Sequence, residues 1–286
     1  MAIKNTDVFI PSLLVDAIKT GFAGMTVMQG TGAAIVRTNM SEGASKVGSK
    51  VIIPYFTNMG EAEDVSTDGG ALTPASLTSS TTEATVKHSG KAFEMTYLAK
   101  SGAGDPYAEA AAQIVEACKR RIDKAIIDAA SLETDWSSYI MDGSASTFNL
   151  EALVDTMALF GDQPDDFAAL VVHSKIRRDM YKIKDTTGRP ILTDSQNGVP
   201  PVLRAYGIPV ITSDRVKAST GVYSNLLVKK NSIGVWIDGN PKVLTDTIAL
   251  SDSEVVAAHI YWCANRYTIM PGSDKPGVAI YKAKAA

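Results

Sequence analysis

The sequence predicts a protein of the α+β class with an extended, plate-like shape. Three observations lead to this prediction. Helical periodicity continues over residues 106–130, residues 46–98 are strand-like only at their two ends, and short α/β elements alternate from residue 148 onward. A helix over 106–130 is roughly 37 Å long, against a mean globular helix of about 11 to 12 residues.

The composition is that of a folded protein and excludes several function classes. The 286 residues include 28 Lys and Arg against 31 Asp and Glu, so the basic surface of a dedicated nucleic-acid binder is missing. Hydrophobic residues make up 45% and charged residues 21%, which argues against disorder. Cys118 and Cys263 form no CxxC motif or Cys/His cluster, so we expect two buried thiols. Without a signal peptide or membrane-spanning run, we expect synthesis in the cytoplasm.

Residues 1–45 are expected to form an arm without a core of its own. A short amphipathic segment near residues 13–18 is followed by a stretch of small residues over 21–32. So few apolar side chains must be buried against something else.

Residues 46–98 are predicted to form a projecting hairpin. One end, residues 50–56, is β-branched and aromatic, and Pro54 within it is typical of an edge strand or a bulge. The other end covers about 81–98, and we expect a bulge at Ser89 and Gly90, where the apolar alternation changes phase. The middle is acidic and has no aromatic or basic residue, so we expect a neighbouring chain to order it.

The helix over 106–130 has clear start signals and one apolar face. Asp105 is the expected N-cap and Pro106 the first helical residue. Apolar residues then repeat every three or four positions, and charged residues occupy the other faces.

Short elements follow from residue 148. We predict a helix from Leu150 to Phe160 that is stopped by Gly161, a buried strand over 167–173 and a helix capped by Ser174. The further strands are expected at 208–212, 225–228, 233–237, 254–269 and 277–282.

No motif for catalysis or ligand binding is complete. Residues 30–35 resemble a dinucleotide-binding loop but have Ile35 in place of the third glycine. A calcium loop from Asp64 would need Glu where Ala75 stands. The three histidines, which lack a second ligand three or four residues away, are interpreted as structural: His88, His173 and His259. We therefore expect no catalytic residue, no cofactor and no metal site, and a protein that is not an enzyme.

The order of these elements resembles the major capsid proteins of tailed bacteriophages, which have the Hong Kong 97-like fold. The segments that carry the resemblance are 48–54 (GSKVIIP), 60–64 (GEAED), 105–106 (DP) with its helix, 170–173 (LVVH), 206–214 (YGIPVITSD) and the two final strand-like runs.

The resemblance implies a Hong Kong 97-like capsid fold in five parts. These are an N-terminal arm (1–45), an extended β-hairpin loop over an adjacent subunit (46–98), a peripheral domain (99–147) with the long spine helix 106–130, an axial α/β domain at the capsomer centre (148–250), and returning strands of the peripheral domain (251–286).

The resemblance also implies a function and partners. The chain would be a major capsid protein that self-assembles into pentamers and hexamers of an icosahedral shell around double-stranded DNA. Assembly is expected in the bacterial host cytoplasm, with a separate scaffolding protein, a portal, non-specific DNA contact and no membrane partner. Two alternatives stay open, an encapsulin-type nanocompartment shell and a cytoplasmic α/β enzyme.

Subunit-interface candidates follow from opposite charge. The acidic group is Glu61, Glu63, Asp64 and Asp68 in the loop, and the basic group is Arg120, Arg121 and Lys124 on the helix. The alternative is that both groups are solvated, since exposed pairs contribute about 0 to 1 kcal/mol.

Some relatives join their subunits covalently through a Lys in the loop and an Asn in the peripheral domain. Lys87 or Lys91 is the candidate lysine here, but Ala257 or Ala258 stands in the Asn position. We therefore expect no crosslink.

Overall fold

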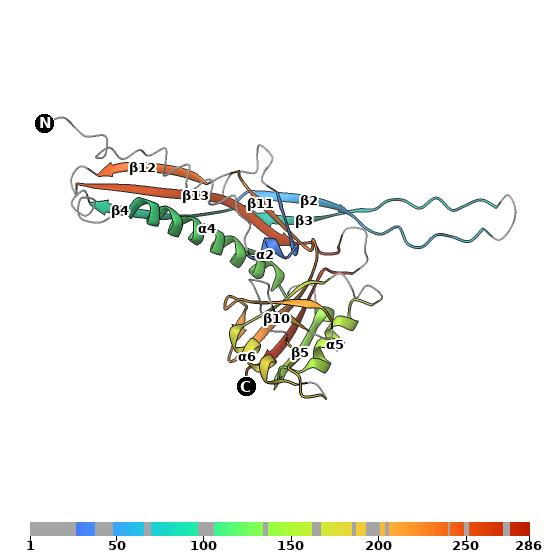
Figure 1. Ribbon diagram of the computed structural model, residues 1–286. Helices are drawn as coiled ribbons and strands as arrows, with labels where there is room; N and C mark the ends of the chain where they lie inside the picture. Colours follow the sequence, from blue (N-terminus) through green and yellow to red (C-terminus); the bar gives the residue numbers. More distant parts are fainter. Residues whose placement is uncertain are drawn as a thin grey trace.

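The protein consists of two β-sheet lobes and a long hairpin that projects from the first lobe (Figure 1). The computed structural model describes residues 27–37, 48–65, 70–96, 106–133, 137–161, 167–184, 187–192, 201–203, 206–239, 241–248, 252–270 and 275–286. The predicted extended shape and mixed α and β content are confirmed in these residues.

The first lobe contains a five-stranded sheet built around one long strand, β13 (Ser253–Arg266). β13 pairs antiparallel with three strands, β4 (Lys87–Thr96), β12 (Lys242–Ile248) and β11 (Ile233–Ile237). β1 (Ala34–Arg37) extends the sheet in parallel beside β11. Alternate residues of β13 are buried from Glu254 to Trp262, so one face of the strand meets the core.

Helix α4 (Pro106–Ala130) lies along this sheet (Figure 1). Ile114, Cys118, Ile122 and Ile126 recur every four residues, and all four are buried in the same core cluster as β13. Packing of such an apolar stripe supplies most of a helix's stability in a protein. The helix predicted over 106–130 is confirmed, and its expected N-cap Asp105 lies outside the described residues.

The second lobe contains a seven-stranded sheet in the order β5-β14-β10-β6-β8-β7, with β9 beside β10. Its strands are β5 (Ile140–Thr147), β6 (Phe167–Val172), β7 (Val202–Leu203), β8 (Ile208–Thr212), β9 (Ala218–Ser219), β10 (Val222–Lys229) and β14 (Val278–Lys284). All of β6 is buried, because Leu170 and Val172 face one core cluster while Ala169 and Val171 face the cluster that contains α4. The predicted buried strand is therefore confirmed.

Two short helices belong to the second lobe, α5 (Leu150–Ala158) and α6 (Ser174–Lys182). The predicted N-cap Ser174 is wrong, because Ser174 is the first helical residue. His173 is the N-cap, and its Nδ1 accepts a hydrogen bond from the backbone N–H of Lys175 at 3.2 Å.

The sheets do not follow the predicted division of the chain. We expected residues 251–286 to return together to one unit, and this is wrong for β14, which pairs with β10 and β5 in the second sheet. Likewise β5 leaves the 99–147 segment for the second sheet, whereas β11 and β12 of the 148–250 segment lie in the first. Which sheet a strand joins is decided by its pairing with strands that are distant in the sequence, and this pairing cannot be read from local sequence patterns.

The bulge predicted at Ser89 and Gly90 is also wrong. β4 runs in unbroken register against β13, and the chain changes partner one residue after β3 (Ser79–Thr85) ends. Gly90 instead allows close approach of the two strands, because a Cβ there would lie 2.6 Å from the carbonyl oxygen of Ala258.

The elements that the sequence did not predict are α2 (Val27–Gly30), the 3-10 helix η2 (Ser137–Tyr139), β1, β5, β7, β9 and β12.

Candidate assembly interface

The projecting hairpin consists of β2 (Lys50–Phe56) and β3. The two strands pair antiparallel in unbroken register, from Lys50 opposite Thr85 to Phe56 opposite Ser79. Beyond them the described residues 57–65 and 70–78 continue as two extended runs, away from both lobes (Figure 1). The predicted hairpin is confirmed, except that β4 belongs to the first sheet.

The root of the hairpin is fixed to the first lobe by its own small core. The residues of this root cluster are Tyr55, Ala84, Val86, Trp236, Cys263 and Tyr267. The rings of Tyr55 and Tyr267 meet edge to face with centroids 6.1 Å apart. Asn265 Nδ2 also donates to the carbonyl oxygen of Glu83 at 2.6 Å. The root is therefore part of the folded subunit.

The hairpin exposes large apolar side chains, both on the outward face of β2 and in the runs beyond it. Each of the following is at least half exposed: Ile52, Phe56, Met59, Val65, Leu72 and Leu77. Scattered exposed apolar residues are ordinary, but a row of them along one thin hairpin marks a surface that a partner covers.

The acidic group lies in the same outer part of the hairpin. Glu61, Glu63 and Asp64 are exposed, and Asp68 lies outside the described residues. Glu63 accepts a hydrogen bond from the backbone N–H of Thr73 at 3.1 Å, so it also links the two runs. The charge of Glu61 and Asp64 is directed to solvent.

The three residues of the basic group on α4 lie in different environments. Arg120 pairs with Glu116 of its own helix at 2.8 Å, with both side chains more than half exposed. Arg121 lies over the ring of Trp262, 4.8 Å from the ring centroid, so its own lobe already engages it. Lys124 is exposed. Figure 1 shows the hairpin extending away from α4, so the structure does not bring the two groups together within one chain.

A groove beside α4 is a surface feature that sequence reasoning missed. It has a volume of about 740 Å³ and lies between α4 and β4. Phe93, Ile114 and Ala117 give it an apolar lining. Lys91 adds positive charge, and Arg120 lines it together with its ion-pair partner Glu116. β4 and α4 are consecutive elements, but the groove between them depends on how the helix packs on the sheet, which no sequence pattern shows.

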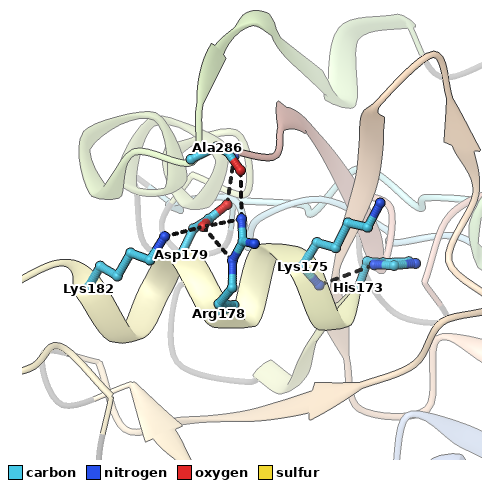
Figure 2. A network of polar contacts seen from close by, with 6 residues as sticks. All are labelled: His173, Lys175, Arg178, Asp179, Lys182 and Ala286. Atoms are coloured by element: carbon cyan, nitrogen blue, oxygen red, sulfur yellow. Dashed lines mark hydrogen bonds and ion pairs between the residues drawn. The ribbon is translucent and has the colours of Figure 1, made fainter.

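The second lobe carries a buried polar network around Asp179 (Figure 2). Asp179 accepts hydrogen bonds from the backbone N–H of Ala286 at 2.8 Å and from Arg178 at 3.0 Å. Arg178 also donates to the carbonyl oxygen of Ala286 at 2.6 Å. Burial alone raises the pKa of Asp179, but these hydrogen bonds and the Arg178 charge outweigh it, so the pKa lies below its usual value. The network ties the end of the sequence to α6.

A second ion-pair network joins α4 to the second lobe. Glu133, just after α4, pairs with Lys217 at 2.9 Å and with Lys282 of β14 at 3.0 Å. Hydrogen bonds from these two lysines lower the pKa of Glu133.

The remaining candidates occupy structural positions. Lys91 lies opposite Ala258 in the β4–β13 ladder, so a candidate crosslinking lysine is part of the first sheet rather than of the hairpin. Both cysteines are buried as predicted, and burial raises the pKa of Cys263 to about 11. The described residues contain no cluster of three or more metal-ligating side chains and no helix that is long and apolar enough to cross a membrane.

Comparison with known proteins agrees with this architecture. Residues 78–265, about two thirds of the chain, match the family described as phage capsid protein. No curated protein matches the sequence. Among solved structures, the capsid of Ralstonia phage GP4 is similar with a TM-score of 0.66 at 10% identity, over 92% of each chain. A chain of Microbacterium phage Oxtober96 is similar with a TM-score of 0.62 at 13% identity, over 98% of this chain and 95% of that one.

A third solved structure is also similar to this chain. The capsid of an empty GTA particle has a TM-score of 0.66 at 15% identity, over 92% of this chain and 91% of that one. The two-sheet fold with its projecting hairpin is therefore shared with these capsid structures. The chain belongs to the phage capsid protein family, and its function is that of a major capsid protein.

Proposed function

We propose that copies of this chain form the pentamers and hexamers of an icosahedral shell that encloses the double-stranded DNA of a tailed bacteriophage. The observation that carries the proposal is the projecting hairpin, whose root is buried in its own subunit while its outer part exposes a row of apolar side chains. Such a segment gains its burial only when a neighbouring copy covers it.

The proposal assigns roles to the parts of the fold. The hairpin is the extended loop, the first lobe with α4 is the peripheral domain, and the second lobe is the axial domain. Residues 1–45 are proposed as the N-terminal arm, of which β1 is part of the first sheet. A separate scaffolding protein and a portal complete the assembly in the bacterial host cytoplasm, and contact with packaged DNA is non-specific, as the net charge of −3 supports.

The outer hairpin is proposed to contact the α4–β4 groove of a neighbour. The groove offers an apolar lining beside Lys91 and the Arg120–Glu116 ion pair. The hairpin offers the exposed side chains of Leu72 and Leu77 and the exposed carboxylates of Glu61 and Asp64. Of the three predicted cations, Arg120 and Lys124 are exposed, whereas Arg121 is engaged by Trp262. Electrostatic complementarity of this kind fixes register and suppresses wrong contacts more than it adds affinity.

A charge exchange tests this contact. Glu61→Lys with Asp64→Lys reverses the acidic group and leaves the hydrogen bond between Glu63 and Thr73 in place. We expect the yield of closed particles, measured by light scattering and negative-stain microscopy, to fall at least tenfold. Adding Lys91→Glu and Arg120→Glu to the same chain is expected to restore part of the yield.

The matched control makes the same charge change elsewhere. Glu151→Lys with Asp155→Lys places two lysines on the exposed surface of α5 in the second lobe and is expected to retain more of the yield. Unchanged yield in the hairpin variant, or no recovery in the exchange variant, would contradict the proposed contact.

The shell is further proposed to be held without covalent links. Ala257 and Ala258 lie beside Ala92 and Lys91 in the first sheet and offer no amide side chain for a Lys. Denaturing gels of mature particles should therefore show one band at 30.3 kDa. A ladder of covalent multimers would overturn this point and leave the rest of the proposal standing.

A further inference from the structure

We propose that His88 and His259 form a binding site for one late first-row transition-metal ion, such as Ni²⁺, Cu²⁺ or Zn²⁺. The site lies on the face of the first sheet that points away from α4. Neither residue has another histidine nearby in the sequence, and only the pairing of β4 with β13 brings them together. The proposal does not depend on shell assembly.

The strand register places the two imidazoles side by side. His88 lies opposite Tyr261, and Gly90 lies opposite His259. Nε2 of His88 is 3.0 Å from Nδ1 of His259, with ring centroids 5.0 Å apart and an angle of 29° between the planes. A hydrogen bond between these nitrogens requires a proton on one of the two, so its direction depends on the tautomer of each ring.

Two neighbours hold this arrangement. A Cβ on Gly90 would lie 3.0 Å from His259 Nδ1 and 2.6 Å from the carbonyl oxygen of Ala258, so the glycine leaves the space in which the His259 ring lies. The ring of Tyr261 stacks on His88 with centroids 4.7 Å apart and planes 15° apart. Both rings are thus positioned before any ion binds.

The nitrogen spacing fits two ligands of one ion. Zn–N bonds are about 2.0 to 2.1 Å, so two nitrogens on one ion at right or tetrahedral angles lie about 2.9 to 3.4 Å apart. The observed separation is 3.0 Å. Neutral imidazole suits Zn, Cu and Ni, whereas Mg²⁺ and Ca²⁺ prefer oxygen ligands.

Solvent completes the coordination. His88 is exposed and His259 is half-buried, so an ion can enter from water and keep water ligands. The described residues hold no third His, Cys, Asp or Glu in this group. Lys242 lies opposite His259 on β12, and its side chain is exposed. An ion at this position would join β4 to β13 close to the root of the hairpin.

Titration of the full-length, tag-free protein with Ni²⁺ and Zn²⁺ in a large excess of Mg²⁺ tests the site. We expect one ion per chain by isothermal calorimetry. His88→Gln and His259→Gln are each expected to weaken binding at least tenfold, because each leaves a single nitrogen ligand.

The chain contains a matched control, since its third and last histidine is His173. His173→Asn removes that imidazole, keeps a side chain that can cap α6, and is expected to leave binding unchanged. Binding by the His88→Gln, His259→Gln double variant equal to that of the wild type would overturn the proposal, as would no binding by the wild type.

A second measurement needs no substitution. Diethyl pyrocarbonate modifies accessible imidazoles, and mass spectrometry of peptides gives the rate at each histidine. Zn²⁺ is expected to slow the modification of His88 and His259 at least fivefold. Equal rates with and without Zn²⁺ would also overturn the site.

Discussion

The second lobe and the projecting hairpin differ in the burial of their apolar residues. In the second lobe, Leu153, Phe160, Leu170 and Met180 are fully buried in one cluster. In the outer hairpin, Leu72 and Leu77 are 62% and 54% exposed. The same kind of side chain therefore stabilises the subunit in one region and remains available to a neighbour in the other.

This difference separates two free energies that are easily confused. Burial within the subunit contributes about 25 cal/mol per Å² of apolar area to folding, whether or not a shell forms. Burial between subunits contributes only when neighbours are present, and it depends on concentration. Substitutions in the two regions should therefore change different measured quantities.

The largest effect on the free subunit is expected in the second lobe. Phe160 is fully buried, meets the ring of Phe167 edge to face at 5.2 Å, and lies 4.9 Å from the Lys229 ammonium. Phe160→Ala should lower the free energy of unfolding by about 3 to 5 kcal/mol, measured by urea denaturation. Val154→Ala, at a partly exposed position of α5, should remain within about 0.5 kcal/mol of the wild type. A small effect at Phe160 would mean that this core is loosely packed.

A smaller effect is expected at the hairpin root. Tyr55 is buried against Tyr267, whereas the next residue, Phe56, points to the other face and is 56% exposed. Tyr55→Ala should cost about 2 kcal/mol, because the root cluster is small and can relax. Phe56→Ala should change the subunit by less than about 0.5 kcal/mol. Equal costs at both positions would show that the root is not a separate anchor.

Sequence patterns correctly predicted the elements that are determined by residues close together in the sequence. The apolar stripe of α4, together with Pro106 as its first residue, was sufficient to predict the helix over 106–130. The hairpin is visible from what residues 57–78 lack, since a stretch without aromatic or basic residues cannot build a core. Both features depend on near neighbours in the sequence.

Features that depend on distant pairing were not predictable. β14 reads as a strand, yet only its ladder with β10 and β5 places it in the second sheet. Gly90 resembles a bulge residue, but it allows close approach to β13. His88 and His259 were interpreted as isolated because the 3.0 Å contact crosses two strands. The α4–β4 groove was not predictable for another reason, because it depends on how the helix packs on the sheet.

A pH-dependent effect is expected where the two lobes meet. The pKa of Glu133 is lowered in the folded protein by its hydrogen bonds to Lys217 and Lys282. Its contribution is therefore present above the unfolded value of 4.5 and is lost as pH falls through the lower folded pKa. Glu133→Gln should cost at most about 1 kcal/mol at pH 7, because the carboxylate is partly exposed.

The measurement is urea unfolding of both proteins from pH 7 downward. The gap between the wild type and Glu133→Gln should narrow as pH drops below 4.5. Asp155→Asn, at an exposed position of α5, controls for the loss of one negative charge. A gap that stays constant down to pH 3 would assign the effect of Glu133→Gln to packing instead of charge.

The smallest effect on the free subunit is expected in the outer hairpin, where the effect on assembly should be large. Leu72→Ser and Leu77→Ser remove exposed side chains, so the free energy of unfolding of the unassembled subunit should change by less than about 0.5 kcal/mol. Closed particles, counted by microscopy after assembly under identical conditions, should become at least tenfold rarer. Leu244→Ser is the matched control, because Leu244 on β12 is 49% exposed but lies outside the hairpin. If Leu72→Ser destabilised the free subunit by several kcal/mol, the hairpin would already be covered within its own chain, and the contrast between the two regions would disappear.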